Sequence, residues 1–189
     1  PDIGGTLHLS TGMMAAAGNR QQQSLGIADS PQAHYDDVMR LTHNTADPDI
    51  VRLTVENAAA TFDWFWDNGF RPLDDHPVYG QGHDPYSVRR YYWAKEGGRA
   101  ILAVLRQQMQ KTIAAGGKID VKLNTPVTAL LTDDAGAVEA VRVKSGDWEQ
   151  VYRARHGLLT SGGYAGNPGL FEKLNGVRHY ALGSYPYSQ

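Results

Sequence analysis

The sequence predicts an α/β fold that combines helices, a parallel sheet and an antiparallel three-stranded meander. Apolar residues recur at steps of three and four after Asp47-Pro48 and again after Gly98, which is typical of amphipathic helices. An alternating run of apolar and polar residues, 118–123, follows the second of these helices after a tight turn at 116–117. A helix followed so closely by a strand favours a parallel sheet, because parallel strands are joined by such crossovers.

Three helices are expected from local start and stop signals. The first begins at Ser30-Pro31, where serine is a good cap and proline fits the first turn. The second begins at Asp47-Pro48 and ends near Gly69. The third begins at Gly98 and ends before the glycine pair 116–117, and its apolar side is expected to lie flat on a sheet.

Strand-like runs follow the third helix. Three of them, 127–132, 138–144 and 149–153, are separated by Asp-, Ser- and Gly-rich turns, so residues 126–155 are predicted to form an antiparallel meander. The next run, 157–163, is apolar and ends in small residues. It predicts a buried strand whose tip allows another group to approach closely.

Composition limits the class of protein. The length of 189 residues predicts a single domain, 1–189, and the 41% hydrophobic and 20% charged residues are typical of a globular protein. The net charge of −2 and the lack of long Lys/Arg runs argue against nucleic acid as a partner. No cysteine is present and no apolar stretch approaches 18 residues, so we expect a cytoplasmic protein without a membrane span.

Three glycine-containing phrases are candidates for ligand contact. They are Gly4-Gly5-Thr6, Thr11-Gly12-Met13 and Thr160-Ser161-Gly162-Gly163. A backbone without side chains lets amide groups reach a phosphate, a sugar or a flat ring, although tight turns for packing explain the same glycines. Neither the GxGxxG fingerprint nor a Walker-type lysine occurs in the chain.

The stretch between Arg71 and Arg99 is dense in Pro, Gly, His and Tyr and predicts a functional or mobile loop. His83, Arg90 and Tyr92 in this stretch are candidates for binding an organic anion and for proton transfer. The alternative is a loop anchored by aromatic burial and stacked arginines. The histidines show no ligand-like spacing, so no metal site is expected.

Taken in order, these phrases resemble the flavoprotein family of fumarate reductases, succinate dehydrogenases and 3-ketosteroid dehydrogenases. The resemblance covers nearly the whole chain, and each phrase is weak alone but specific in its order and spacing. The matching segments are Gly4-Gly5, Ser10–Gly18, Gln23, Gly26–Ser30, Asp63–Phe65, Gly98, Asn124–Val127 and Thr160–Asn167.

The resemblance implies a partial FAD/NAD(P)-binding, Rossmann-like domain. In the family, a GxGxxG unit precedes the double glycine and a substrate cap follows the last matching segment, so both are expected outside this chain. The groups that bind dicarboxylates and deliver the proton are expected there as well, and the catalytic residues are therefore unknown. Because a sheet edge and face would be exposed, we expect a second chain or a ligand to cover them.

The resemblance also implies which residues surround a flavin. They are Gly4, Gly5 and Thr6 near the pyrophosphate and ribityl chain, Thr11, Gly12 and Met13 near the isoalloxazine, Val127 near the adenine, and Thr160, Ser161, Gly162 and Gly163 over the nucleotide. Members that bind FAD covalently have a histidine where this chain has Thr6, and His8 is out of that register. Non-covalent FAD is therefore implied.

The implied activity is that of an FAD-dependent oxidoreductase, which transfers hydride between flavin N5 and a C–C bond of a small organic substrate. Where succinate dehydrogenases read Arg-Thr-Gly-His, this chain reads Glu96-Gly97-Gly98, which weakens succinate or fumarate as the substrate. The tyrosine-rich stretch suits a larger substrate, as in the ketosteroid dehydrogenases. A further alternative is a non-catalytic piece with only a binding or structural role.

Overall fold

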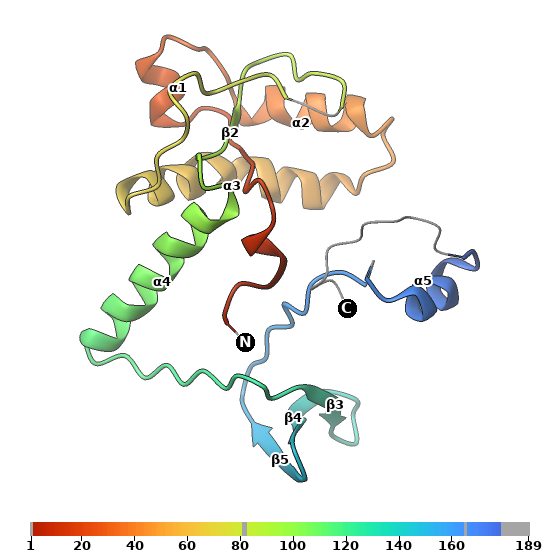
Figure 1. The fold of residues 1–189 in the computed structure, drawn as a ribbon. Coiled ribbons are helices and arrows are strands. Elements are labelled where there is room, and N and C mark those ends of the chain that lie inside the picture. Colours follow the sequence, from red (N-terminus) through yellow and green to blue (C-terminus); the bar gives the residue numbers. More distant parts are fainter. Residues whose placement is uncertain (1, 81–82, 165, 179–189) are drawn as a thin grey trace. The chain divides into compact units, whose positions relative to one another are not determined.

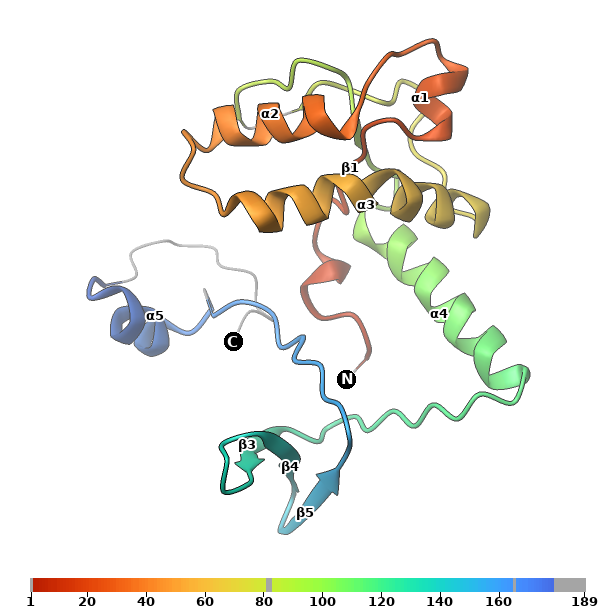
Figure 2. The ribbon, with the colours of Figure 1, turned by 180° about the vertical axis from the view of Figure 1, so that it is seen from behind.

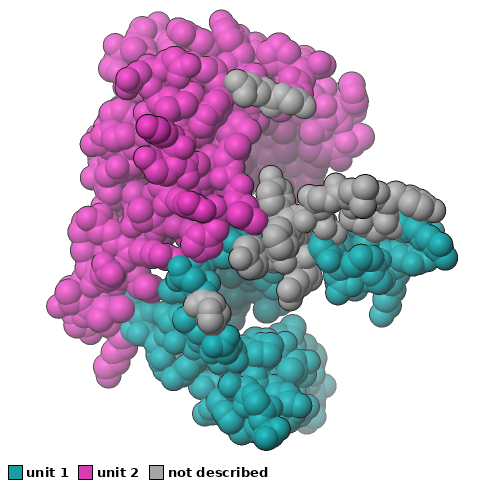
Figure 3. All heavy atoms as spheres, viewed as in Figure 1, with its two compact units in different colours: residues 1–6, 119–189 teal, residues 7–118 magenta. Residues whose placement is uncertain are grey.

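The computed structural model describes residues 2–80, 83–164 and 166–178. The chain divides into two compact units, which Figure 3 shows in two colours. Unit 1 contains residues 1–6 and 119–189, and unit 2 contains residues 7–118. In the part of the chain that the structure describes, no helix has the length and apolar character needed to cross a membrane.

Unit 2 is built mainly from helices, as Figures 1 and 2 show. Its elements are β1 (Met14–Ala15), α1 (Arg20–Ser24), α2 (Pro31–Leu41), α3 (Pro48–Asp67), β2 (Tyr91–Tyr92) and α4 (Gly98–Ala114), preceded by the 3-10 helix η1 (Gly5–His8), which spans the boundary between the units. Strands β1 and β2 pair antiparallel, with Met14 opposite Tyr92. The three long helices agree with the predicted ones.

Local signals explain where these helices begin. The Ser30 hydroxyl accepts a hydrogen bond from the Ala33 amide at 3.1 Å, and the Asp47 carboxylate accepts one from the Asp49 amide at 2.9 Å. Each cap satisfies an amide that has no partner inside the helix. Helix α4 differs, because Gly97 makes no side-chain cap.

The core of unit 2 is an aromatic cluster between α3, α4 and the β1–β2 pair. Phe62 of α3 is 1% exposed, and its ring centroid lies 4.1 Å from that of Tyr92 and 6.2 Å from that of Phe70. Ala16 and Val104 complete the buried cluster together with Ala94. Packing of large aromatic rings is the main apolar stabilisation of this unit.

A buried ionic network ties the loop before β2 to α2. The Arg90 guanidinium donates to both carboxylate oxygens of Asp29, at 3.0 and 2.8 Å, and to Asp37 at 2.6 Å. Asp37 also accepts from the amide and hydroxyl of Ser87 and from Arg40. Burial opposes the charged form of Asp37, but these hydrogen bonds outweigh it and lower its pKa to about 2.

Unit 1 contains the predicted meander. Strands β3 (Val127–Thr132), β4 (Val138–Ser145) and β5 (Trp148–Arg153) pair antiparallel in the order β3-β4-β5. Helix α5 (Pro168–Asn175) follows, capped by Asn167. Among the described residues of this unit, the buried hydrophobic side chains are those of Ala140 and Val143.

Two predicted strands are wrong. Residues 118–123 and 157–163 form no strand, and Leu158 and Leu159 are 87% and 69% exposed instead of buried. A strand needs a neighbour for its hydrogen bonds, and no other strand pairs with either run within the described residues. All strand pairs in this part of the chain are antiparallel, so the parallel sheet, and with it the packing of α4 on a sheet, is not confirmed.

Candidate functional site

The predicted flavin loop is fixed to the start of α4 by close backbone contacts. A Cβ on Gly98 would lie 2.2 Å from the Leu7 carbonyl oxygen, and a Cβ on Gly12 would lie 2.7 Å from Gly98 Cα. The Gly98 amide donates to the Ser10 carbonyl at 2.9 Å, and the Ser10 hydroxyl accepts from the Gly12 amide at 3.2 Å. These glycines are required because any side chain would push the loop off the helix.

The loop presents its remaining side chains outward. Gly12 is buried, whereas Thr11 and Met13 on either side of it are exposed. Met13 is a large apolar residue with 40% of its surface accessible. The loop therefore has a rigid base and an accessible edge, which suits contact with a flat ring, although the predicted contact with the isoalloxazine stays a prediction.

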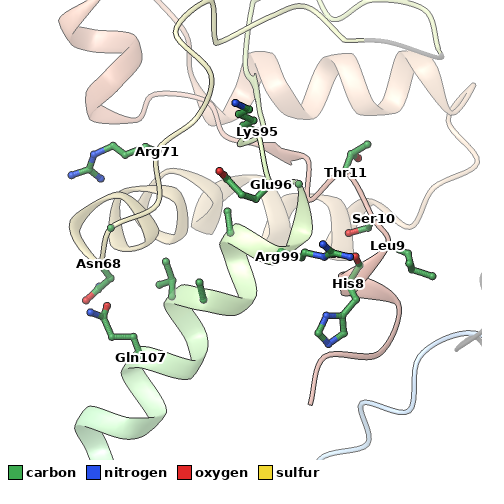
Figure 4. A pocket seen from close by; sticks show the side chains of 15 residues that line it. His8, Leu9, Ser10, Thr11, Asn68, Arg71, Lys95, Glu96, Arg99 and Gln107 are labelled. Atoms are coloured by element: carbon green, nitrogen blue, oxygen red, sulfur yellow. The ribbon is translucent and has the colours of Figure 1, made fainter. Parts of the chain in front are cut away.

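A cleft of about 970 Å³ runs beside this loop in unit 2 (Figure 4). Its walls come from three segments: the loop after η1, the turn after α3, and the start of α4 with the residues just before it. The lining residues are His8, Leu9, Ser10, Thr11, Asn68, Gly69, Arg71, Lys95, Glu96, Gly97, Arg99, Ala100, Ala103, Val104 and Gln107. Its volume is in the range of small-molecule sites.

Two of the arginines that line the cleft are held in place by carbonyl groups. Arg99 Nε donates to the His8 carbonyl at 3.3 Å, and Figure 4 shows the two side chains next to each other near the start of α4. Arg71 donates to the Trp66 and Phe70 carbonyls at 2.6 and 2.7 Å, and its guanidinium stacks on the Trp66 ring at 4.7 Å. Both guanidinium groups keep further N–H groups that these contacts do not use.

The other predicted cofactor residues lie in unit 1. Gly4, Gly5 and Thr6 share this unit with Val127 and with the run 160–163. Figures 1 and 2 both show the start of the chain beside the coil that follows β5. Gly5 (φ +49°) and Gly162 (φ +80°) have no atom within 4 Å of where a Cβ would stand, so these backbones have room for a ligand. Their predicted contact with the nucleotide stays a prediction.

His83 forms an ordered pair with Tyr91. Its Nε2 lies 2.9 Å from the Tyr91 hydroxyl, and its Nδ1 contacts the Asp84 carbonyl. Because a carbonyl can only accept, Nδ1 carries the proton and Nε2 accepts from Tyr91. Gly80 allows this pair, since a Cβ there would lie 3.0 Å from both rings.

Tyr86 extends this pair into the interior of unit 2. Its ring centroid lies 5.0 Å from that of Tyr91 and 5.3 Å from that of His83. Burial, together with a hydrogen bond to Tyr91, raises the pKa of the Tyr86 phenol. The three rings therefore form a cluster that runs from a buried phenol to an exposed imidazole.

Arg90 and Tyr92 have no exposed side-chain surface. Arg90 is bound by its two carboxylates, and the Tyr92 hydroxyl exchanges hydrogen bonds with Asn19 at 2.9 and 3.1 Å. Burial raises the pKa of Tyr92 to about 12. These contacts give both residues a structural role, as expected for a loop that is anchored by buried aromatic rings and arginines. Contact of Arg90 and Tyr92 with a substrate stays a prediction.

Sequence reasoning missed the residues that complete these arrangements. Tyr91 stands directly between Arg90 and Tyr92, two predicted site residues, and this position was a signal. Asp29 and Asp37 gave no local signal, because they are 61 and 53 residues from Arg90 in the chain.

Residues 1–185 match the family described as FAD binding domain. The chain is 32% identical over 177 residues to a fumarate reductase (cytochrome) of Shewanella frigidimarina, and this match covers 93% of the chain and 30% of that relative. It is 30% identical over 175 residues to an NADH:fumarate oxidoreductase of Klebsiella pneumoniae, covering 92% of the chain and 18% of that relative.

Solved structures share the fold. A flavocytochrome c3 fumarate reductase matches with a TM-score of 0.81 at 24% identity, over 100% of this chain and 32% of that one. A 3-ketosteroid Δ1-dehydrogenase of Sterolibacterium denitrificans matches with a TM-score of 0.75 at 17% identity, over 98% of this chain and 46% of that one. With the match over residues 1–185, these findings show that the chain belongs to the FAD binding domain family and that its cofactor is FAD.

Proposed function

We propose that the protein is an FAD-dependent oxidoreductase of the fumarate reductase type, which transfers hydride between flavin N5 and a C–C bond of a small organic substrate. The observation that carries this proposal is the match of residues 1–185 to the family, supported by 30–32% identity to two fumarate-reducing enzymes. The chain spans 30% of the length of the first of these relatives. The oxidoreductase activity of the whole protein is therefore part of what we propose.

The chain offers two kinds of surface that suit the cofactor. The open backbones at Gly5 and Gly162 would hold the nucleotide part without covalent attachment, and the accessible edge at Thr11 and Met13 would face the ring. When bound, FAD supplies a site that accepts or releases hydride. The protein's part is to bind, to orient and to exclude water.

The second hydrogen of such a reaction moves as a proton, and the His83–Tyr91 pair is suited to handle it. When the substrate is oxidised, the Tyr91 oxygen can take the proton from the substrate carbon while the hydroxyl proton passes to His83 Nε2, and reduction reverses both transfers. The Asp84 carbonyl keeps the imidazole in the required tautomer. The aromatic surroundings of this pair favour a ring-bearing substrate over a small dicarboxylate.

The first experiment is a visible absorption spectrum of the protein purified in the longest form that its gene encodes. We expect a flavin spectrum whose chromophore is released by mild denaturation, because no covalent link is expected. Gly162→Val should lower flavin content, whereas Gly146→Val should not. Both glycines have positive φ and open space around the Cβ position, so backbone strain is matched and only the predicted ligand contact differs.

A turnover assay with fumarate and with a 3-ketosteroid then identifies the substrate class. Activity with the ketosteroid alone would favour the larger substrate that the aromatic cluster suggests. A folded but colourless protein that takes up no added FAD would contradict the proposed function and leave a binding or structural role.

A further inference from the structure

We propose that Tyr86 is a positioning residue for proton transfer between Tyr91 and His83: its phenol donates to the Tyr91 oxygen and favours passage of the Tyr91 proton to His83. The inference deepens the proposed function and rests on it for the reaction in which the pair is used. Its structural basis is a cluster of three rings, those of residues 83, 86 and 91, whose centroids lie 5.0 to 5.5 Å from one another.

The hydrogen bonds of this cluster run in one direction. His83 Nδ1 donates to the Asp84 carbonyl, so Nε2 accepts from the Tyr91 hydroxyl, 2.9 Å away. A hydroxyl has one proton, so the Tyr91 oxygen can only accept in its other side-chain hydrogen bond, which joins it to Tyr86. The Tyr86 phenol is therefore the donor, and the chain of hydrogen bonds runs from Tyr86 through Tyr91 to His83.

Contacts on several sides hold the Tyr86 ring in this position. The residue is 9% exposed, His34 of α2 packs edge-on against its ring at 5.4 Å between centroids, and the Arg90 guanidinium lies 4.9 Å from the ring centroid. Asp37 of α2 fixes the next residue, since it accepts from the Ser87 amide at 2.8 Å and from the Ser87 hydroxyl at 2.7 Å. A donor that is held in this way needs no reorganisation when charge develops beside it.

The donor matters when the Tyr91 proton moves. Transfer of this proton to His83 breaks the O–H bond of Tyr91, forms an N–H bond at Nε2 and leaves a phenolate beside an imidazolium. During oxidation of the substrate, the phenolate oxygen takes the substrate proton. A hydrogen bond to a charged oxygen is stronger than one to a neutral oxygen, so Tyr86 stabilises the phenolate more than the phenol of Tyr91.

Tyr86 itself stays protonated while this happens. Burial and the hydrogen bond to Tyr91 raise the pKa of the Tyr86 phenol, so it remains available as a donor. Its titratable and charged surroundings come from its own loop and from α2: they are His83, Tyr91, Arg90, His34 and Asp37.

The order of proton loss tests the proposal without substrate or turnover. Carbon-13 NMR of the full-length protein, labelled at tyrosine Cζ, follows each phenol as pH rises, and Tyr91→Phe and Tyr86→Phe assign the two signals. We expect Tyr91 to lose its proton while the protein is still folded and Tyr86 to keep its own. A Tyr91 signal that does not move before unfolding, or a Tyr86 signal that moves first, would overturn the proposal.

Tyr86→Phe removes the donor but keeps the ring that packs against His34 and Arg90. Tyr91 should then need about ten times more hydroxide to lose its proton, the effect of one hydrogen bond to a charged oxygen. Tyr79→Phe is the matched control, because it removes a phenol from the same loop at a side chain that is 50% exposed, and it should leave the Tyr91 titration unchanged. A shift in Tyr86→Phe no larger than that in Tyr79→Phe would overturn the proposal. If Tyr86→Phe does not fold, the order of proton loss in the wild type still decides.

Turnover of flavin-loaded protein gives a second readout. Tyr86→Phe should lower kcat about tenfold and leave KM unchanged, because the phenol assists proton transfer and not substrate binding. Flavin binding with turnover that Tyr86→Phe leaves unchanged would overturn the role of Tyr86 and leave the redox function standing. A colourless protein in which Tyr86→Phe still shifts the Tyr91 titration would contradict the redox function and support the hydrogen-bond chain.

Discussion

The two units treat their apolar side chains differently. Unit 2 buries Phe62, Phe70 and Tyr92 almost completely within its own helices and the β1–β2 pair. In unit 1, side chains of the same apolar kind remain open: Leu130 is 44% exposed and Val138 is 54% exposed. The aromatic cluster of unit 2 is therefore enclosed by elements of that unit, whereas these two side chains of the meander stay open within the part of the chain that the structure describes.

The physical reason is the number of layers in each unit. A sheet buries one face only when another helix or sheet packs on it, and a three-stranded meander has no second layer of its own. Helices α3 and α4 both contribute to the buried cluster, through Phe62 and Val104, although Leu105 further along α4 is 42% exposed. This difference places most of the intrinsic stability in unit 2. We expected a second chain or a ligand to cover the open faces of unit 1, and this stays a prediction.

Truncation of a core aromatic residue should give the largest effect. Phe62→Ala should lower the free energy of unfolding by about 4 kcal/mol, because it removes the ring against which Phe70 and Tyr92 pack. Leu130→Ala in unit 1 should cost less than about 1 kcal/mol, since that side chain is nearly half exposed. Urea unfolding followed by circular dichroism measures both.

Equal losses for Phe62→Ala and Leu130→Ala would break the comparison. They would mean that the meander face is covered in solution. Measurement of the oligomeric state would then show whether a second chain covers it.

The two units also differ in the burial of their ion pairs. Loss of a buried pair should give the second-largest decrease in stability. Arg90→Met should destabilise unit 2 by about 3 kcal/mol, because it leaves Asp29 and Asp37 charged, buried and without their guanidinium. Arg153→Met breaks an exposed pair with Glu139 on the meander and should cost less than about 1 kcal/mol. Thermal unfolding of both variants checks the difference.

A small loss for Arg90→Met would show that the buried carboxylates take up protons or water instead. The pH dependence of stability in this variant would distinguish the two, since protonated carboxylates would make its stability rise at low pH relative to the wild type.

Elements with strong local signals could be predicted from the sequence. The caps at Ser30 and Asp47 and the Asp- and Gly-rich turns of the meander act over a few residues, and α2, α3 and the three strands agree with them. The runs 118–123 and 157–163 have an equally clear pattern but form no strand. Alternation states which face a strand would bury, but it cannot supply the neighbouring strand on which the hydrogen bonds depend.

The candidate site shows the same limit. Gly12 could be identified as a close-approach position and Gly98 as the start of a helix, but only the structure shows that the two glycines lie against each other and that Gly98 lies against the Leu7 carbonyl. Arg90 could not be assigned from the sequence, because its two carboxylate partners are far away in the chain. A basic residue among tyrosines is typical both of a ligand site and of a buried ion pair. Only the tertiary contacts distinguish these two possibilities.

The smallest expected effect is a pH dependence confined to unit 2. His34 packs edge-on against Tyr86 and is 4% exposed. Burial, with the nearby Arg90 charge adding to it, lowers its pKa to about 4, while Asp29 and Asp37 act in the opposite direction. The unfolded chain takes up a proton on this imidazole near pH 6.5, above the value in the folded unit, so stability should fall as pH falls through this window.

Lowering the pH from 6.5 to 5.5 should therefore reduce the free energy of unfolding by about 1 kcal/mol through this group. His34→Phe keeps a ring against Tyr86 without a titratable nitrogen and should flatten the profile between pH 6.5 and 4. His156→Phe, at an exposed position in unit 1, should leave the slope unchanged. If both variants keep the wild-type slope, His34 is solvated in the folded protein. Burial of polar side chains would then not distinguish the helical unit from the meander.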